Sequence, residues 1–314
     1  MRILVMGATG FIGRNIAEKF SKYPTMKVTG VHNRVRPYDL PNLNWVQADL
    51  TNSADVDRVV RDADVIVQAA ATTSGSKDIV SRPHIHVTDN AVMNALVFRA
   101  AHDHGVRHVV FFSCAIMYPS SNIPLKETDF DPDVPMHPRY FGAGWTKLYA
   151  EKMCEFYAGL GRTKFTAIRH SNIYGPHDKF DLERSHVMGA TITKALTAQD
   201  GRITVWGRGT EGRDLLYVDD LVNMVHRAIE RQQRPFGLYN VGLGEAVSVG
   251  DLVRMVVAAS GRSLAVEHDL SKPSIDTTLS LDCGLVRDEL GWEPKIPLAE
   301  GIARTIRWRH AQSN

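Results

Sequence analysis

The sequence has few cysteines, almost no net charge and no long apolar run. Cys114, Cys154 and Cys283 are scattered among 314 residues and odd in number, which argues against a disulfide framework or a zinc knuckle and fits a reducing compartment. A formal net charge of +2 gives no strong field for nucleic acid or for a membrane surface. No apolar run approaches the length that spans a bilayer, so neither nucleic acid nor membrane is an expected partner.

The sequence also lacks a recognisable leader and a metal-binding cluster. Its opening, MRILVMGATG, starts a strand at once, without the apolar core and cleavage site of a signal peptide, and we expect a cytoplasmic protein. His84 and His86 in RPHIHVT have no nearby cysteine or carboxylate to complete a metal site. We interpret this histidine pair as part of a surface loop and expect no bound metal.

Through the first half of the chain, apolar strand-like runs alternate with helical patterns. RILVMG, KVTGV, WVQADL and DVIVQAAA are short apolar runs, and RNIAEKFSKY places its apolar residues on one helical face. This alternation predicts the α/β class, with a Rossmann-type doubly wound parallel sheet. We expect residues 1–172 to form an NADP-binding domain, with returning segments near 214–242. Residues 173–314 are expected to form mainly a smaller α/β substrate-binding lobe that is packed on the first without a linker.

Three glycines follow the first predicted strand at regular spacing. Gly7, Gly10 and Gly13 in GATGFIG separate this strand from the first predicted helix. Glycines at these places permit a tight turn and let the backbone approach a pyrophosphate at the helix N-terminus. The strand, turn and helix context favours a dinucleotide site over a turn that only packs. The same loop also contributes Thr9, Phe11 and Ile12 to the predicted cofactor site.

No acidic residue follows the second predicted strand, where NAD-binding chains usually place one for the ribose hydroxyls. The segment reads VHNRVRP, and Arg34 and Arg36, beside Asn33, could hold a 2′-phosphate together with Arg14. This pattern favours NADP over NAD; the alternative is that the arginines are solvated surface charge. The predicted cofactor site also includes residues that follow the third and fourth strands, which are Asp49, Leu50, Ala69, Ala70 and Ala71.

Two distal segments, SNIYGPHDKFDLERSHV and ITVWGRGTEGRDLLYVDDL, are the most specific part of the sequence. With them the chain resembles the extended short-chain dehydrogenase/reductase family of sugar-nucleotide epimerases and reductases, most of all its GDP-L-fucose synthase-like members. The resemblance implies an NAD(P)-dependent oxidoreductase or epimerase that acts on a nucleotide-linked sugar, with GDP as the expected nucleotide. The segment DTTLSLD departs from the pattern, because Thr278 stands where fucose synthase-like chains carry Arg.

The resemblance also implies roles for individual residues. Asn172 and Arg213 would contact the substrate, with Arg213 on the diphosphate, where a guanidinium fork suits phosphate oxygens. His186 matches the acid/base histidine of the epimerising step. The remaining matches are Trp206 near the base or ribose, Lys272 and Asp282 at the nucleotide end, and Lys147 and His170 in the cofactor site.

A homodimer with twofold symmetry is expected from the same resemblance. In the family, two long helices pair with their copies across the interface, and here they correspond to residues 88–104 and 141–160. The apolar residues expected at this interface are Val92, Leu96, Phe98, Leu148 and Met153.

The expected catalytic pair is incomplete. The family places a proton-transferring Tyr four residues before the Lys that binds the nicotinamide ribose, whereas Ala143 precedes Lys147 at that spacing. The family also places a Ser or Thr four residues before a Tyr after the fifth strand. In FFSCAIMYP that place is held by Cys114, with Ser113 before it, and a thiol is a weak hydrogen-bond donor.

Several explanations of this departure stay open. The alanine could be an engineered replacement of tyrosine, or the proton role could have moved to Tyr140, or to Cys114 and His186. The protein could also bind its nucleotide sugar without turning it over, or epimerise it by enolisation alone. Because the predicted cofactor and diphosphate ligands are retained, we expect an enzyme.

Overall fold

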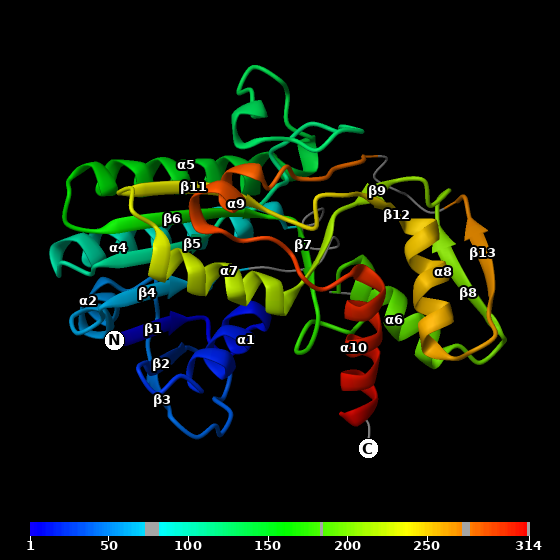
Figure 1. Cartoon of the computed structure of the whole chain (residues 1–314), viewed down its shortest axis with the longest axis horizontal. Helices are drawn as coiled ribbons and strands as arrows, with labels where there is room; N and C mark the ends of the chain where they lie inside the picture. The colour runs from blue at the N-terminus through cyan, green and yellow to red at the C-terminus, as the bar shows by residue number, and fades with distance from the viewer. Residues whose placement is uncertain (73–81, 183–184, 272–276, 313–314) are drawn as a thin grey trace.

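A parallel sheet of seven strands organises the larger part of the molecule, shown in the computed structural model of Figure 1. The structure describes residues 1–72, 82–182, 185–271 and 277–312. The strands are β1 (Arg2–Met6), β2 (Lys27–His32), β3 (Leu43–Gln47), β4 (Val65–Gln68), β5 (His108–Phe112), β6 (Lys164–His170) and β11 (Phe236–Val241). Their order is β11-β6-β5-β4-β1-β2-β3. The order reverses between β1 and β4, which opens a ligand-binding crevice at their carboxyl ends.

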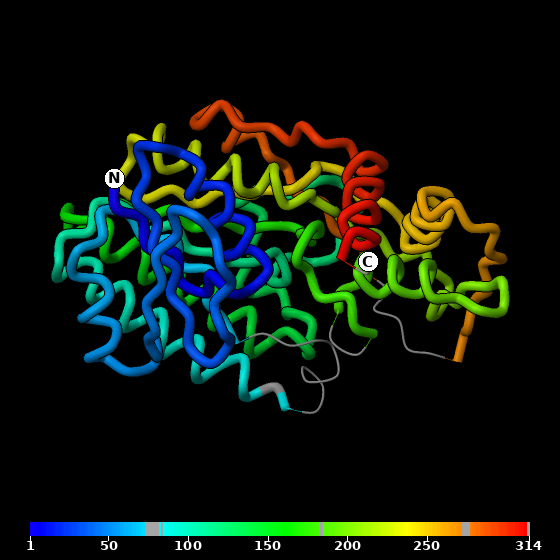
Figure 2. Tube along the Cα trace, turned by 90° about the horizontal axis from the view of Figure 1, so that it is seen from below, coloured from blue at the N-terminus to red at the C-terminus, as the bar shows by residue number. Residues whose placement is uncertain are grey.

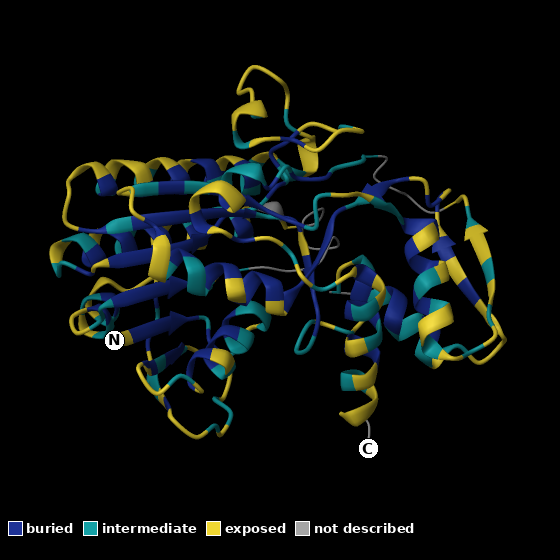
Figure 3. Ribbon diagram, viewed as in Figure 1, coloured by how far each residue is buried: buried dark blue, intermediate teal, exposed yellow. Residues whose placement is uncertain are grey.

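Helices cover both faces of this sheet, as the predicted doubly wound fold requires. One face carries α1 (Phe11–Phe20), α7 (Val218–Arg231) and α9 (Gly284–Leu290), and the other carries α2 (Ser53–Val60), α4 (Thr88–Asp103) and α5 (Phe141–Gly159). Val65 and Val67 point into the first core and Ile66 into the second, so β4 is apolar on both sides. Figure 3 shows the central strands buried, and β4 and β5 are buried along their whole length. The predicted fold class is confirmed.

A second lobe follows along the chain and has its own core. It contains α6 (Val187–Thr197), β8 (Arg202–Trp206), α8 (Val249–Ser260), β13 (Ala265–Asp269) and α10 (Leu298–Ala311). Ile192, Val205 and Leu252 are buried together in it, and β8 pairs in parallel with β13. Figures 1 and 2 place this lobe at one end of the sheet. No helix among the described residues is long and apolar enough to cross a bilayer.

The two lobes are interleaved. Short pairs join β7 (Asn172–Tyr174) to β10 (Leu215–Tyr217) and β9 (Gly212–Arg213) to β12 (Val247–Ser248). The buried carboxylate of Asp214 accepts hydrogen bonds from the backbone N–H groups of Leu243, Gly244 and Leu281 at 2.7–3.1 Å. One side chain therefore ties together three segments that are distant in sequence.

Two expectations about surface residues were wrong. Phe98 and Leu148 are buried in the core of their own chain, because α4 and α5 turn these side chains toward the sheet. The large apolar side chains exposed along α5 are instead Phe141, Trp145, Tyr149 and Phe156. His86 is also buried, in a short 3₁₀ helix at Pro83–His86, where its carbonyl accepts a hydrogen bond from Asn90 of α4.

Candidate active site

The glycine loop between β1 and α1 is shaped by close backbone contacts. Gly7 has a φ of 71°, and a Cβ added there would lie 2.7 Å from the Cα of Ala70. A Cβ on Gly13 would overlap the carbonyl oxygen of Gly7. Gly10 is exposed, and a Cβ there would meet only the Gly7 oxygen at 3.3 Å. The loop is therefore packed against the segment after β4 and open at Gly10.

Among the residues that the structure describes, no side chain caps the N-terminus of α1, which suits it to an anion. Gly10 caps the helix without a side-chain hydrogen bond, and the first turn contains no acidic residue. Unpaired N–H groups and the helix dipole favour negative charge at such a terminus. Thr9, Phe11 and Ile12 are half-buried around it. The open loop and the free N–H groups fit a dinucleotide pyrophosphate.

The segment after β2 presents exposed arginines. Asn33, Arg34 and Arg36 are exposed, and Arg34 contributes to a lowered pKa of Asp49, after the hydrogen bonds from Thr51. The Asn33 carbonyl also accepts a hydrogen bond from Gln47 at 3.1 Å.

Arg14 is engaged elsewhere. Its Nε donates to Glu18 Oε1 at 2.8 Å, and its guanidinium lies 4.1 Å from the centre of the Tyr38 ring. Of the arginines considered for a 2′-phosphate, Arg34 and Arg36 are therefore the ones directed to solvent. The other predicted residues of this region differ in burial. Asp49, Ala69 and Ala70 are half-buried, Leu50 is buried and Ala71 is exposed.

Lys147 is held at the edge of the sheet by α5. Its Nζ donates to the Phe112 carbonyl at 2.6 Å and lies 4.8 Å from the centre of the Phe111 ring. Burial lowers the pKa of Lys147. Ala143 is half-buried one turn earlier, on the same face of the helix, and has no group that could transfer a proton.

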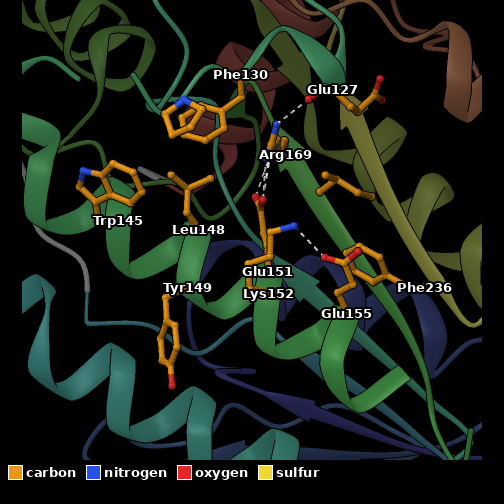
Figure 4. A pocket seen from close by; sticks show the side chains of 12 residues that line it. Glu127, Phe130, Trp145, Leu148, Tyr149, Glu151, Lys152, Glu155, Arg169 and Phe236 are labelled. Atoms are coloured by element: carbon orange, nitrogen blue, oxygen red, sulfur yellow. Dashed lines mark hydrogen bonds and ion pairs between the residues drawn. The ribbon is translucent and has the colours of Figure 1, made fainter. Parts of the chain in front are cut away.

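A buried ion pair fixes α5 one turn after Lys147. Arg169 of β6 contacts Glu151 through Nε at 3.0 Å and through Nη2 at 2.7 Å, as Figure 4 shows. Ser113 donates to the same carboxylate at 2.5 Å, and Arg169 donates to the Tyr118 hydroxyl at 2.9 Å. Ser113 is buried in this network, with its hydroxyl on Glu151. Sequence analysis missed the pair, although Glu151 continues the four-residue spacing of Ala143 and Lys147.

The other residues considered for proton transfer are not equivalent. Cys114 is half-buried, and burial raises the pKa of its thiol. Tyr140 precedes the first residue of α5 and packs on His137, with ring centres 5.5 Å apart. Two helical turns, roughly 10 Å of rise, separate Tyr140 from Lys147, so the structure does not bring the two together.

Two of the predicted histidines interact electrostatically with each other, and one of them, His170, also lies near Lys147. His170 is the last residue of β6 and donates from Nδ1 to the Ser171 carbonyl at 2.7 Å. Burial, together with the charges of the nearby Lys147 and His186, lowers the pKa of His170 to about 4, although the hydrogen bond to Ser171 acts in the opposite direction. His186 is exposed and caps the N-terminus of α6.

The predicted substrate residues fall into two places. Asn172 is exposed and donates from Nδ2 to the Asp214 carbonyl at 3.1 Å, which puts it next to Arg213. The guanidinium of Arg213 donates to the carbonyls of Gly212, at 2.8 Å, and of Thr277. Trp206 stands apart at the end of β8 and is 51% exposed.

Of the two residues predicted at the nucleotide end, the structure describes only Asp282. Asp282 accepts a hydrogen bond at 2.7 Å from the Gly284 N–H at the start of α9. Lys272 lies outside the described residues.

A separate cavity of about 530 Å³ opens on the outer side of α5. Its wall contains the Arg169–Glu151 pair and aromatic side chains such as Phe130 and Trp145. Of the residues predicted to bind cofactor or substrate, none that the structure describes lines it. The candidate active site is instead the edge where the glycine loop, Lys147 and His170 lie. Within the described part of the chain, no cluster of three His, Cys, Asp or Glu residues could hold a metal ion.

Comparisons with known proteins identify related sequences and structures. The sequence pattern of the NAD dependent epimerase/dehydratase family matches residues 3–242. The chain is 25% identical to GDP-L-colitose synthase of Yersinia pseudotuberculosis, over 98% of this chain and 97% of that protein. It is 30% identical to the probable GDP-L-fucose synthase 1 of Oryza sativa subsp. japonica, over 83% of this chain and 81% of that protein. The structure of a UDP-glucose 4-epimerase from Thermotoga maritima superimposes with a TM-score of 0.88 over the whole of both chains, at 23% identity, and supports the fold.

Proposed function

The chain belongs to the NAD dependent epimerase/dehydratase family, and from that premise we propose that it is an NAD(P)-dependent oxidoreductase or epimerase acting on a nucleotide-linked sugar. The observation that carries the proposal is the meeting of two features at one edge of the sheet. The open α1 terminus at Gly10 follows β1 and suits a pyrophosphate, and Lys147 is held at the end of β5, two strands along the sheet from β1.

The residues of the chain have distinct parts in this proposal. A bound nicotinamide cofactor would exchange a hydride with a carbon of the sugar. The glycine loop would bind its pyrophosphate, and Lys147 would bind the ribose beside the nicotinamide. Asn172 and Arg213 would hold the sugar nucleotide, with the Arg213 guanidinium on its diphosphate, and His186 would exchange a proton next to a keto group.

For the nucleotide and the cofactor, we propose GDP and NADP. Both sequence relatives compared above are named for GDP-sugars. The exposed Arg34 and Arg36, together with the absence of an acid after β2, favour a 2′-phosphate. NAD is the alternative cofactor.

We also propose that the protein is a cytoplasmic homodimer with twofold symmetry. The support is the row of exposed aromatic side chains along α5, in which Tyr149 is 60% and Phe156 62% exposed. Several large apolar side chains exposed on one helix often mark an interface. Light scattering at micromolar concentration tests the dimer, and a monomer would contradict it.

A second candidate function is favoured by Ala143, which leaves the helix without the family's proton carrier. In that case the protein binds a nucleotide sugar and NADP without turnover. The test is to mix the purified protein with NADP⁺ or NADPH and with GDP-mannose or UDP-glucose. Calorimetry measures binding, nicotinamide absorbance measures redox chemistry, and solvent deuterium uptake measures epimerisation. Binding without either reaction supports the second candidate, and failure to bind contradicts both.

A further inference from the structure

The proton group that Ala143 lacks has a replacement within the same site. We infer that Nε2 of His170 accepts the proton of the hydroxyl group on the reacting carbon of the sugar. The inference rests on the proposed function, and it assigns a catalytic role to a residue that the sequence placed only in the cofactor site.

The position of His170 is set by the sheet. Phe112 of β5 pairs with Ile168 of β6, so His170 extends two residues beyond that pair, at the carboxyl edge where ligands of such sheets bind. The Phe112 ring packs on His170, with centres 6.2 Å apart and planes at 64°. Because Lys147 Nζ donates to the Phe112 carbonyl at 2.6 Å, one residue positions both the lysine and the imidazole.

The hydrogen bond at Nδ1 defines what Nε2 can do. The Ser171 carbonyl can only accept, so Nδ1 carries the proton and donates at 2.7 Å. In the neutral ring the lone pair is then on Nε2, which has no hydrogen-bond partner among the described residues. Burial and the positive charge of Lys147 keep the pKa of His170 near 4. The imidazole is therefore neutral at physiological pH and available as an acceptor.

The alternatives are less suited to this role. The thiol of Cys114 stays protonated, because burial raises its pKa, and it is a weak donor. Tyr140 lies two turns away from Lys147. His186, exposed at the N-terminus of α6, lies close enough to lower the pKa of His170, which suits it to a neighbouring carbon of the sugar.

In the proposed step, one proton and one hydride leave the sugar and each has an acceptor. In the oxidation direction the sugar O–H bond breaks and its proton goes to His170 Nε2. The C–H electron pair leaves as hydride to the nicotinamide of bound NADP⁺ or NAD⁺, and the C–O bond becomes a ketone.

The experiment compares the wild type with His170→Ala, His170→Gln and Ala143→Tyr, and with the double variant that combines His170→Ala and Ala143→Tyr. Turnover is measured with NADP⁺ and with GDP-mannose or UDP-glucose, and calorimetry gives the affinity for each sugar. We expect His170→Ala and His170→Gln to lower turnover by about 10²–10⁴-fold, while the affinity falls by less than about 10-fold. Added imidazole should restore part of the His170→Ala activity, and the double variant should regain it through the tyrosine.

A readout independent of turnover is the imidazole proton resonance of His170 in the cofactor-loaded protein. It should shift when GDP-mannose is added, and Ala143→Tyr provides the matched control. Full activity of His170→Ala would overturn the inference and leave the proposed function intact. An inactive wild-type protein combined with an active Ala143→Tyr variant would have the same two consequences. If neither protein turns over either sugar, the proposed function fails for those sugars. In that case the resonance alone decides the inference, and an unmoved signal overturns it.

Discussion

The glycine loop and the first turns of α5 lie at the same edge of the sheet but constrain the sequence in different ways. In the loop, a single added carbon at Gly7 or Gly13 would collide with backbone atoms, so the residue type is dictated by shape. At the start of α5, Ala143 is half-buried, and a Cβ added to its neighbour Gly142 would meet a side-chain methyl group of Val87 rather than backbone atoms. Nothing in the packing there specifies which group carries a proton. The shape of the cofactor-binding glycine loop is therefore set by the backbone, whereas the acid/base group depends on one side chain that can be replaced.

The largest expected effect concerns the network that holds α5. Glu151→Ala leaves the buried Arg169 guanidinium without its carboxylate and should lower the free energy of unfolding by about 3–5 kcal/mol. Urea denaturation measures it. Glu155→Ala one turn later removes an exposed partner of Lys152 and should change stability by less than about 1 kcal/mol. Equal losses in the two variants would show that the buried pair does not anchor the helix.

The glycine loop gives the next largest effect. Gly13→Ala places a methyl group against the Gly7 carbonyl, which should lower the free energy of unfolding by about 2–3 kcal/mol and weaken NADP binding. Gly159→Ala, in α5, meets no atom within 4 Å and should stabilise the protein by about 0.5–1 kcal/mol. Thermal unfolding and cofactor titration test both variants. If Gly13→Ala kept its stability and its affinity, the loop would not be shaped by packing.

The next prediction concerns Arg34, a side chain in the predicted cofactor site. Arg34→Ala should weaken NADPH binding by about 1–2 kcal/mol, because a charged hydrogen bond to the 2′-phosphate is lost at an exposed position. NADH lacks that phosphate, so its affinity in the same variant is the control. Fluorescence titration measures both cofactors, and an equal loss for the two would contradict a preference for NADP.

The smallest expected effect is a pH dependence at Glu18 of α1. Burial raises the pKa of Glu18, but hydrogen bonds from His177 and Arg14 outweigh it and hold the pKa at about 2, below the ordinary 4.5. The stabilisation is therefore complete above pH 4.5 and is lost as the pH falls toward 2. Glu18→Gln should flatten the dependence of the urea midpoint on pH across this window. An unchanged slope would show that the pair contributes nothing to folding.

The fold could be predicted because it follows from periodicity and from glycine. The alternation of strand and helix patterns, and the spacing of Gly7, Gly10 and Gly13, record backbone requirements that stand in the sequence itself. The roles assigned to individual site residues stay predictions, since they depend on a ligand.

Other features depend on contacts between distant segments and could not be predicted from the sequence. Arg14 is directed to Glu18 and Tyr38, and Phe98 is turned into its own core, although helical spacing alone left both orientations open. His170 acquires its neighbours from α5 and α6, which only the tertiary fold brings to the end of β6.

The position of β11 at one end of the sheet has a consequence for how the protein is made. Phe165 of β6 pairs with Phe236 of β11, and the first part of the second lobe, including α6 and β8, lies between them in sequence. When the chain leaves the ribosome, β6 is therefore synthesised long before the strand that covers its open side. The sheet of the nucleotide-binding half therefore stays incomplete until α6 and β8 of the second lobe have been synthesised. Until then its unpaired strand edge could associate with other chains. The order of synthesis makes the two halves a single folding unit, whose slowest step should be the closure of this long-range pairing.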